Sequence, residues 1–120
     1  MELGARGETH ACGYLVEKGY KVIARNHRQR WGELDIVARA KDKTLVFVEV
    51  KTMKNGGEGA LVPEDQMSGS KMKKFSRTAE QYANLHANLI NERAGWRLDV
   101  LALTEKGDTF EVCHYINVSQ

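Results

Sequence analysis

Apolar residues recur along this chain with two spacings, one typical of helices and one typical of strands. A first stripe at helical spacing predicts a helix over residues 7–18, which Gly19 would end. A second and longer stripe predicts a helix over residues 70–92, with Gly95 beyond its end. The two stripes consist of Ala11, Cys12, Leu15 and Val16, and of Met72, Phe75, Ala79, Tyr82, Ala83, His86, Leu89 and Ile90.

Five other segments have the composition and periodicity of strands. Leu34, Ile36 and Ala38 alternate with other residues, so we expect them to share one face of a strand. The segment 44–51 is apolar on both faces, as in a central strand that is covered on each side. Residues 52–69 have little periodicity, which predicts a functional or mobile loop. We expect strands over 21–25, 33–39, 44–51, 96–103 and 109–118, with turns over 26–32, 41–43 and 105–108.

The predicted order of elements is α-β-β-β-α-β-β, which indicates an α/β fold. At 120 residues, the whole chain 1–120 is expected to form one domain. No apolar run approaches the roughly 20 residues that span a bilayer, and the first residues lack the regions of a signal peptide. We therefore expect a cytoplasmic protein with no membrane partner. Cys12 and Cys113 lie within apolar patterns and are expected to be reduced thiols in the core.

Basic residues gather in two segments, although the net charge is only +2. Basic groups clustered in this way can follow a phosphate backbone. The alternative is a solvated surface that the 16 acidic residues balance. The two clusters are Arg25, Arg28 and Arg30, and Lys71, Lys73, Lys74 and Arg77, of which Arg25, Arg28, Lys71 and Lys74 are the candidate nucleic-acid contacts.

Two ionisable residues end the most apolar strand. Glu49 and Lys51 are two positions apart, so their side chains share the face that carries Leu45 and Phe47. A lone buried charge is costly, and a buried ion pair or a metal site is the usual resolution. The pattern leaves two alternatives open: a functional centre, or a structural salt bridge with Lys51 reaching solvent.

Asp35 adds a second carboxylate. A turn over 41–43 would place its strand beside the strand of Glu49, so the two side chains could converge at one end of the sheet. Two carboxylates that lie close together repel unless a cation joins them, and hard oxygen ligands suit Mg²⁺ or Mn²⁺. The alternative is a solvated acid near a turn, which the flanking Leu34 and Ile36 disfavour.

Glu8 extends the apolar stripe of the first helix, because it lies one turn before Cys12 and two turns before Leu15. An inward acid at this place could support a metal centre from behind its direct ligands. The alternative is that Glu8 interacts favourably with the dipole at the N-terminus of the helix.

A series of short motifs surrounds these residues along nearly the whole chain. They are Gly4-x-x-Gly7-Glu8, Ala11, Tyr14-Leu15, Gly19-Tyr20, Arg25-Asn26-x-Arg28, Gly32-Glu33-Leu34-Asp35, Val46-Phe47-Val48-Glu49-Val50-Lys51, Lys71 and Arg97-Leu98-Asp99-Val100. The series closely resembles the YraN-like bacterial family, and Asp35 followed by Glu49-Val50-Lys51 resembles the D-x(n)-E-x-K signature of PD-(D/E)XK nucleases. The signature alone is easily matched by chance, whereas the combined series is specific.

The resemblance implies a restriction-endonuclease-like core, in which helices flank a mixed five-stranded sheet, similar to Holliday junction resolvases. It also implies that Glu8, Asp35, Glu49 and Lys51 match a nuclease centre. In a first hypothesis, Asp35, Glu49 and the Val50 carbonyl hold Mg²⁺ or Mn²⁺, and Lys51 orients water or stabilises charge on the phosphate. The substrate would be DNA rather than RNA, with branched DNA favoured by analogy, and a homodimer would match the symmetry of a junction.

A second hypothesis is a nucleic-acid-binding module that has the same fold but does not cut. The intact acid–acid–lysine set argues against it, because a pure binder does not need costly buried charges together. Two interpretations remain open for each of two further pairs of residues. Arg97 and Asp99 form a structural ion pair or border the site, and Trp31 and Tyr20 pack against the protein or stack on bases. His86 is expected to be structural.

Overall fold

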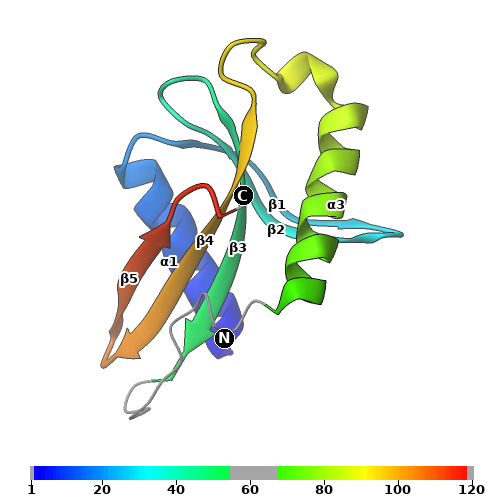
Figure 1. The fold of residues 1–120 in the computed structure, drawn as a ribbon. Helices are drawn as coiled ribbons and strands as arrows, with labels where there is room; N and C mark the ends of the chain where they lie inside the picture. Colours follow the sequence, from blue (N-terminus) through cyan, green and yellow to red (C-terminus); the bar gives the residue numbers. More distant parts are fainter. Residues whose placement is uncertain (1, 55–67, 119–120) are drawn as a thin grey trace.

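The computed structural model describes residues 2–54 and 68–118. Within them, two helices cover the two faces of a five-stranded sheet (Figure 1). The elements confirm the predicted order and the mixed α/β fold. They are α1 (Leu3–Glu17), β1 (Lys21–Gln29), β2 (Gly32–Arg39), β3 (Leu45–Met53), α3 (Gly69–Leu85), a short 3₁₀ turn η1 (Ala87–Leu89), β4 (Trp96–Lys106) and β5 (Thr109–Tyr115).

The sheet has the spatial order β1-β2-β3-β4-β5. Neighbouring strands are antiparallel except β3 and β4, which run parallel because the chain crosses over through α3 between them. The residues from Leu45 to Val48 are fully buried, as predicted for a central strand. Apolar clusters lie on both faces: Phe47 and Leu98 pack with Phe75 of α3, whereas Val46 and Leu101 pack with Leu15 of α1.

The predicted turn over 26–32 is wrong. β1 continues to Gln29 and pairs with β2 down to Gly32, so the turn consists only of Arg30 and Trp31. The polar composition of this segment suggested a loop because the hairpin extends beyond the sheet, where most of its side chains face solvent. In Figure 1 this hairpin passes behind α3 and projects past it.

Leu34 does not share a face with Ile36 and Ala38, contrary to the predicted alternation. Leu34 packs in the cluster under α3, and the other two pack under α1. Ile36 and Leu34 pair with Arg25 and His27, on either side of Asn26 in β1. The φ of Asn26 is 49°, in the left-handed region that asparagine tolerates. The outer half of the hairpin is therefore turned relative to the inner half, and Asp35 lies where this change occurs.

Both helix boundaries differ from the prediction. α1 begins at Leu3 rather than at residue 7. α3 ends at Leu85, and the predicted stretch to residue 92 contains η1 and a turn. The Asn91 side chain accepts hydrogen bonds from the N–H groups of Arg93 and Ala94 and so stabilises this turn instead of a helix. The helix starts with Ser68, whose hydroxyl accepts from the Lys71 N–H as an N-cap.

The cysteines are both free, and Cys12 is half-buried, but Cys113 is exposed. The expectation of a core thiol is wrong for Cys113 because β5 is an edge strand with one face toward solvent. The predicted loop over 52–69 falls largely on residues 55–67, which lie outside the described residues. None of the helices described is both long and apolar enough to cross a membrane.

Candidate metal and nucleic-acid site

Strands β2 and β3 part at the point where Asp35 and Glu49 lie. The paired residues of this ladder run from Arg39 and Leu45 to Ile36 and Val48 and go no further. Beyond this point the Asp35 carboxylate takes the place of a ladder bond, because its Oδ2 accepts the Val50 N–H at 2.9 Å. The sheet therefore opens between two strands, and an acidic side chain fills the opening.

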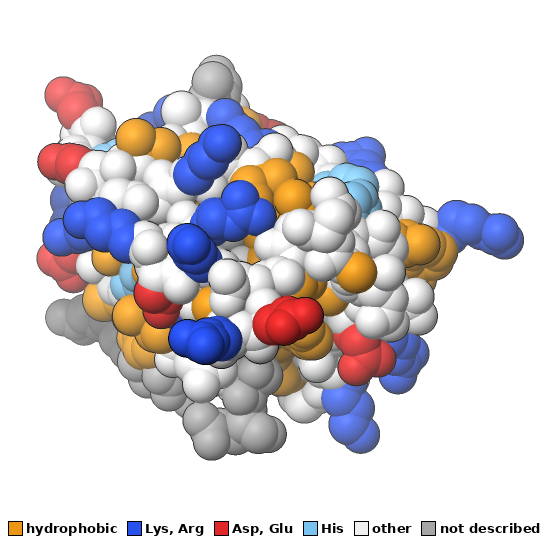
Figure 2. Space-filling view, turned by 90° about the horizontal axis from the view of Figure 1, so that it is seen from above, with side chains coloured by type: hydrophobic (Ala, Val, Ile, Leu, Met, Phe, Trp, Pro, Cys, Tyr) orange, Lys and Arg blue, Asp and Glu red, His pale blue; other side chains and the backbone are white. Residues whose placement is uncertain are grey.

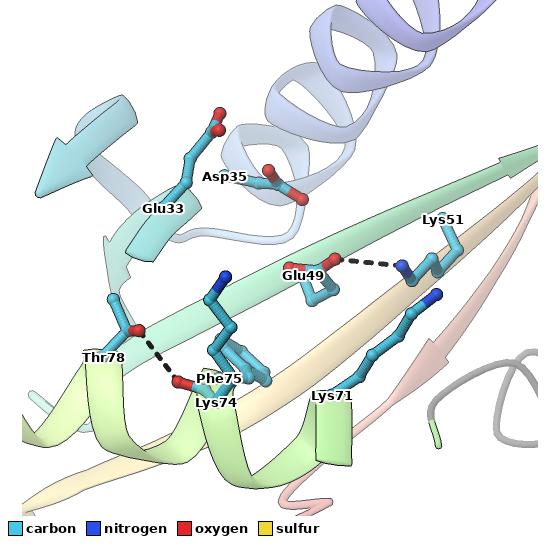
Figure 3. A pocket seen from close by; sticks show the side chains of 8 residues that line it. All are labelled: Glu33, Asp35, Glu49, Lys51, Lys71, Lys74, Phe75 and Thr78. Carbon is cyan, nitrogen blue, oxygen red and sulfur yellow. Dashed lines mark hydrogen bonds and ion pairs between the residues drawn. The ribbon is translucent and has the colours of Figure 1, made fainter. Parts of the chain in front are cut away.

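Glu49 and Lys51 share one face of β3, as predicted, and form an ion pair. The Lys51 Nζ lies 3.2 Å from the Glu49 Oε2, and both side chains are about four-fifths buried, with 22% and 21% of their surface exposed. Figure 3 shows this pair below Asp35, with Lys71 and Lys74 extending from α3 toward it. Lys51 therefore neutralises part of the carboxylate charge, and within residues 2–54 and 68–118 no basic group forms an ion pair with Asp35.

Asp35 is strained electrostatically at neutral pH. Burial and the nearby charge of Glu49 raise the pKa of Asp35 from 3.8 to about 7. The hydrogen bond from the Val50 N–H and the charge of Lys51 lower this pKa but do not offset the rise. A carboxyl group in this state gains stability from a proton or from a metal cation. The prediction that Asp35 and Glu49 converge near Lys51 agrees with this geometry.

Glu8 reaches the same place from α1. Burial and the charge of Asp35 raise the pKa of Glu8, while Arg25 and a hydrogen bond with Asn26 lower it. Among the described residues, the Oε1 atom of Glu8 is buried without a hydrogen-bond partner, and Nη2 of Arg25 lies 3.9 Å from it. The helix-dipole alternative is wrong because α1 begins at Leu3, which leaves Glu8 beyond the first turn.

Gly7 allows this approach. It is buried against β3, and a Cβ at this position would overlap the Thr52 side chain. α1 can therefore lie directly on β3 at the end where Lys51 emerges. The motif Gly7-Glu8 thus combines a close contact with an acidic residue that the contact brings into the site.

Two clefts meet at Asp35. One, of about 270 Å³, lies between the sheet and α3 and is lined by Lys71, Lys74 and Thr78 (Figure 3). The other, of about 850 Å³, lies on the α1 side and is lined by Glu8, Arg25 and Arg28, among others. Glu33, Asp35 and Lys51 line both clefts. The site is therefore a continuous groove across the end of the sheet, with acids at its centre and basic residues on each side.

The oxygen atoms available suit a hard divalent cation. Among residues 2–54 and 68–118, no three His, Cys, Asp or Glu side chains stand together as a ready metal cluster. The donor set proposed from the sequence needs only two side chains, Asp35 and Glu49, and takes the Val50 carbonyl as a third oxygen. Carboxylate and carbonyl oxygens completed by water are ligands that Mg²⁺ accepts. The buried and unpartnered oxygen of Glu8 is a further group that water or a cation would satisfy.

The sequence profile of "Uncharacterised protein family UPF0102" matches residues 7–103. The chain belongs to this family. A UPF0102 protein of Syntrophotalea carbinolica is 40% identical over 115 residues, which cover 96% of this chain and 89% of that protein. A second, of Geobacter sulfurreducens, is 43% identical over 102 residues, which cover 85% and 75% of the two chains. The resemblance to the YraN-like family is thereby confirmed.

A solved structure, that of Pyrococcus furiosus SfsA in complex with Ca²⁺, aligns with 94% of this UPF0102 chain and 61% of that chain. The TM-score is 0.35 and the sequence identity is 15%. A similarity at this level supports no conclusion about either fold or function.

The four basic residues predicted to contact nucleic acid lie along the groove of this UPF0102 protein. Arg25 donates to the Thr9 Oγ1 at 3.3 Å, whereas Arg28 is exposed, with its Nε 3.6 Å from a carboxylate oxygen of Glu33. Lys71 and Lys74 lie on one face of α3. Basic side chains also occur at the end of the molecule that carries the β2–β3 turn (Figure 2). The groove therefore differs from other basic parts of the surface because its basic residues lie beside acidic ones.

Three residues of the site gave no clear signal in the sequence. Asn26 faces Glu8 and takes a left-handed conformation, Glu33 lines both clefts, and Thr78 closes one of them. Asn26 and Glu33 lie within the motifs noted above, but membership in a motif does not indicate where a side chain points. Thr78 lies within a predicted helix but belongs to none of the motifs.

A buried polar network lies apart from this groove. Asp99 is fully buried and accepts from Arg97 at 3.0 Å, from His114 at 2.8 Å and from the Asn117 N–H at 3.0 Å. Arg97 also donates to the Tyr20 hydroxyl at 2.9 Å. None of these residues lines either cleft. The structural interpretation of the Arg97–Asp99 pair and the packing interpretation of Tyr20 are therefore supported.

His86 is structural, as expected. Its ring stacks on Tyr82 with 4.0 Å between centroids, and its Nδ1 lies 3.0 Å from the Tyr82 carbonyl oxygen at the end of α3.

Asp35→Asn should raise the free energy of unfolding of the metal-free protein at pH 8 by about 2–4 kcal/mol. The folded state raises the pKa of Asp35, so this group costs stability as pH rises from its ordinary pKa toward 7. The gain should therefore fall to a few tenths of a kcal/mol, roughly, at pH 3.5, where the group is protonated in the folded state and mostly protonated in the unfolded state. Urea unfolding at both pH values measures this.

Asp42→Asn is the matched control, because it removes the same charge at the opposite end of the β2–β3 hairpin. Hydrogen bonds from Thr44 lower the pKa of the exposed Asp42, so this change should not stabilise the protein at pH 8. A gain at pH 8 that is equal in both variants would show that net charge, rather than the position of Asp35, is responsible.

Proposed function

We propose that this protein is a metal-dependent nuclease that hydrolyses phosphodiester bonds in DNA. The observation that carries the proposal is the Asp35–Glu49 pair, where burial and mutual repulsion raise the pKa of Asp35 to about 7 beside Lys51. Such a pair costs stability in the absence of a cation, so folding alone does not account for it. A function that uses a bound cation accounts for the pair.

Each residue of the site would have its own role. Asp35, Glu49 and the Val50 carbonyl would hold Mg²⁺ or Mn²⁺. When bound, such a cation polarises a phosphate and lowers the pKa of a water. Lys51 would place its ammonium against the charge that develops on the scissile phosphate or orient the attacking water. Glu8, with its unpartnered Oε1, would accept a hydrogen bond from water in the site.

The basic residues on both sides of the groove would hold the phosphate backbone. Lys71 and Lys74 extend from α3 over the acids (Figure 3), and Arg25 and Arg28 line the opposite cleft. This arrangement would let a strand cross the acidic centre while cations neutralise it on either side. The resemblance to resolvases favours branched DNA as the substrate and a homodimer as the active form.

A cleavage panel tests the proposal. Labelled single-stranded, duplex, flapped and four-way DNA, and a matched RNA, are incubated with the protein in Mg²⁺, in Mn²⁺ and in EDTA. We expect cutting of at least one DNA substrate that depends on the divalent cation. Binding of DNA without cutting in any of these conditions would favour the alternative, a nucleic-acid-binding module with an inactive centre.

Binding to DNA should weaken with salt in proportion to the phosphate contacts made. Lys71→Ala and Lys74→Ala should each reduce the slope of log affinity against log salt by about one. Lys73→Ala is the matched control, because Lys73 carries the same charge on the same helix but does not line the cleft. Fluorescence anisotropy at several salt concentrations gives the slopes. Equal slopes for the three variants and the parent would exclude these lysines as contacts.

A further inference from the structure

The tip of the β1–β2 hairpin carries a large aromatic side chain in an exposed position. Trp31 is one of the two residues of the turn, and 38% of its surface is exposed. Trp96, by contrast, is half-buried and packs edge-to-face on Phe47 with 5.5 Å between ring centroids. An exposed tryptophan at the end of a projecting hairpin contributes little to the core of the protein.

The hairpin contacts α3 at Thr78. The Thr78 hydroxyl donates to the Lys74 carbonyl oxygen at 2.8 Å and lies 3.4 Å from the Trp31 carbonyl oxygen, and a Cβ on Gly32 would overlap this hydroxyl. His27 packs edge-to-face on Tyr82, with 4.9 Å between ring centroids. Because Thr78 also lines the cleft that contains Asp35, Trp31 adjoins one end of that cleft.

Basic residues outnumber acidic ones near Trp31. The side chain of Arg28 is 80% exposed and pairs with Glu33, Arg30 is exposed in the turn beside Trp31, and Lys74 lies one helical turn before Thr78. Figure 2 shows basic and apolar side chains together on the rightmost projection of the molecule, where Figure 1 places this hairpin. An exposed aromatic ring on a hairpin tip that also carries basic residues suits a base next to phosphates, whereas a second copy of the same basic tip would be repelled.

β2 links Trp31 directly to the acids. Asp35 follows Trp31 by four residues, and an extended strand rises about 3.3 Å per residue, so the two lie about 13 Å apart along it. This length is about four base-pair rises of a B-form duplex, at about 3.4 Å each. A nucleic acid whose phosphate lay at Asp35 could therefore place a base a few nucleotides away on Trp31.

We propose that Trp31 stacks on an unpaired nucleobase, so that the protein prefers nucleic acid in which a duplex borders unpaired nucleotides. The faces of bases inside a duplex are already stacked on their neighbours, which leaves unpaired bases as partners for the ring. This inference rests on the proposed function for the placing of the phosphate, but the binding preference can be measured without any cleavage.

The first test uses Trp31 as its own reporter. Trp96→Phe leaves Trp31 as the sole tryptophan of the chain. In EDTA, a duplex with a three-nucleotide central gap should quench its fluorescence, whereas the intact duplex of the same length and ends should not. The same pair made of RNA shows whether the base preference extends to RNA. Equal quenching by gapped and intact duplexes, or none by either, would overturn the inference.

The second test measures affinity. Base–aromatic stacking predicts that Trp31→Ala weakens binding of the gapped duplex by about 5- to 150-fold and leaves the intact duplex unaffected. Trp31→Phe should retain much of the preference, and Lys74→Ala should weaken both duplexes equally. If Trp31→Ala instead abolished self-association of the protein in sedimentation, the partner of Trp31 would be a second copy and the inference would be wrong.

Adding Mg²⁺ to the same complexes separates the two proposals. Cuts are expected within about four nucleotides of the gap, from the spacing of Trp31 and Asp35. Trp31-dependent binding without any cutting would refute the nuclease and support the inference. Cutting that is the same for the parent and Trp31→Ala, at sites unrelated to the gap, would refute the inference and support the nuclease.

Discussion

Lys51→Ala should lower the rate of metal-dependent DNA cleavage by about 10²–10³ and leave DNA affinity nearly unchanged. The Lys51 Nζ pairs with Glu49 at the junction of the two clefts, where it can reach a phosphate held at the acids. Binding should change little, because one lysine is a small part of a footprint of several phosphates. Single-turnover cleavage and fluorescence anisotropy measure the two quantities separately.

Lys54→Ala is the control for this experiment, since Lys54 is exposed three residues later and lines neither cleft. It should cut at the parental rate. If Lys51→Ala also cut at the parental rate, Lys51 would have no part in the chemistry, even if the protein were a nuclease. If both variants lost DNA binding equally, the effect would come from charge alone.

Asp99→Ala should lower the free energy of unfolding by about 3–5 kcal/mol at neutral pH. The change leaves the Arg97 guanidinium and His114 without the carboxylate that both contact in a fully buried place. Burial alone would raise the pKa of Asp99, but hydrogen bonds from His114, Arg97 and the Asn117 N–H hold it below its ordinary value. The stabilisation by Asp99 is therefore present at neutral pH and lost as pH falls below about 4.

Urea unfolding at pH 7 and pH 3.5 measures both effects. Glu111→Ala, which removes an exposed acid from β5, should change the free energy of unfolding by less than about 0.5 kcal/mol. A loss below about 1 kcal/mol for Asp99→Ala at pH 7 would show that the network is not a main support of β4 and β5.

The sequence predicted the sheet and the residues of its central strand well, because the strongest patterns are local. The apolar run before Glu49 can only be a buried strand, and the two-residue spacing of Glu49 and Lys51 decides that they share a face. The pairing of the two hairpin strands then brings Asp35 to Glu49. These conclusions depend on periodicity alone.

The approach of α1 depended on a contact between distant segments. Gly7 meets Thr52 across 45 positions of the chain, and nothing in either neighbourhood indicates the other. The start of α1 at Leu3 was missed for a similar reason, since Gly4 and Gly7 weaken the local preference for a helix. Both details decide where Glu8 points.

The hairpin tip illustrates a different limit. The alternation of β2 changes opposite Asn26, which has a left-handed backbone angle, and Trp31 is exposed because the hairpin extends beyond the sheet. The type of side chain predicts neither the backbone angle of Asn26 nor the exposure of Trp31. For an aromatic residue in a polar segment, the sequence favoured packing over base stacking.

The most direct test of the proposed metal centre is the cleavage rate of DNA against Mn²⁺ concentration for three proteins: the parent, Asp35→Asn and Asp42→Asn. We expect the parent and Asp42→Asn to cut with the same saturating dependence on Mn²⁺. We expect Asp35→Asn to remain folded and to bind DNA, but not to cut at any Mn²⁺ concentration. Cutting by Asp35→Asn at the parental rate, or cutting by the parent in EDTA, would contradict a metal centre at Asp35 and Glu49.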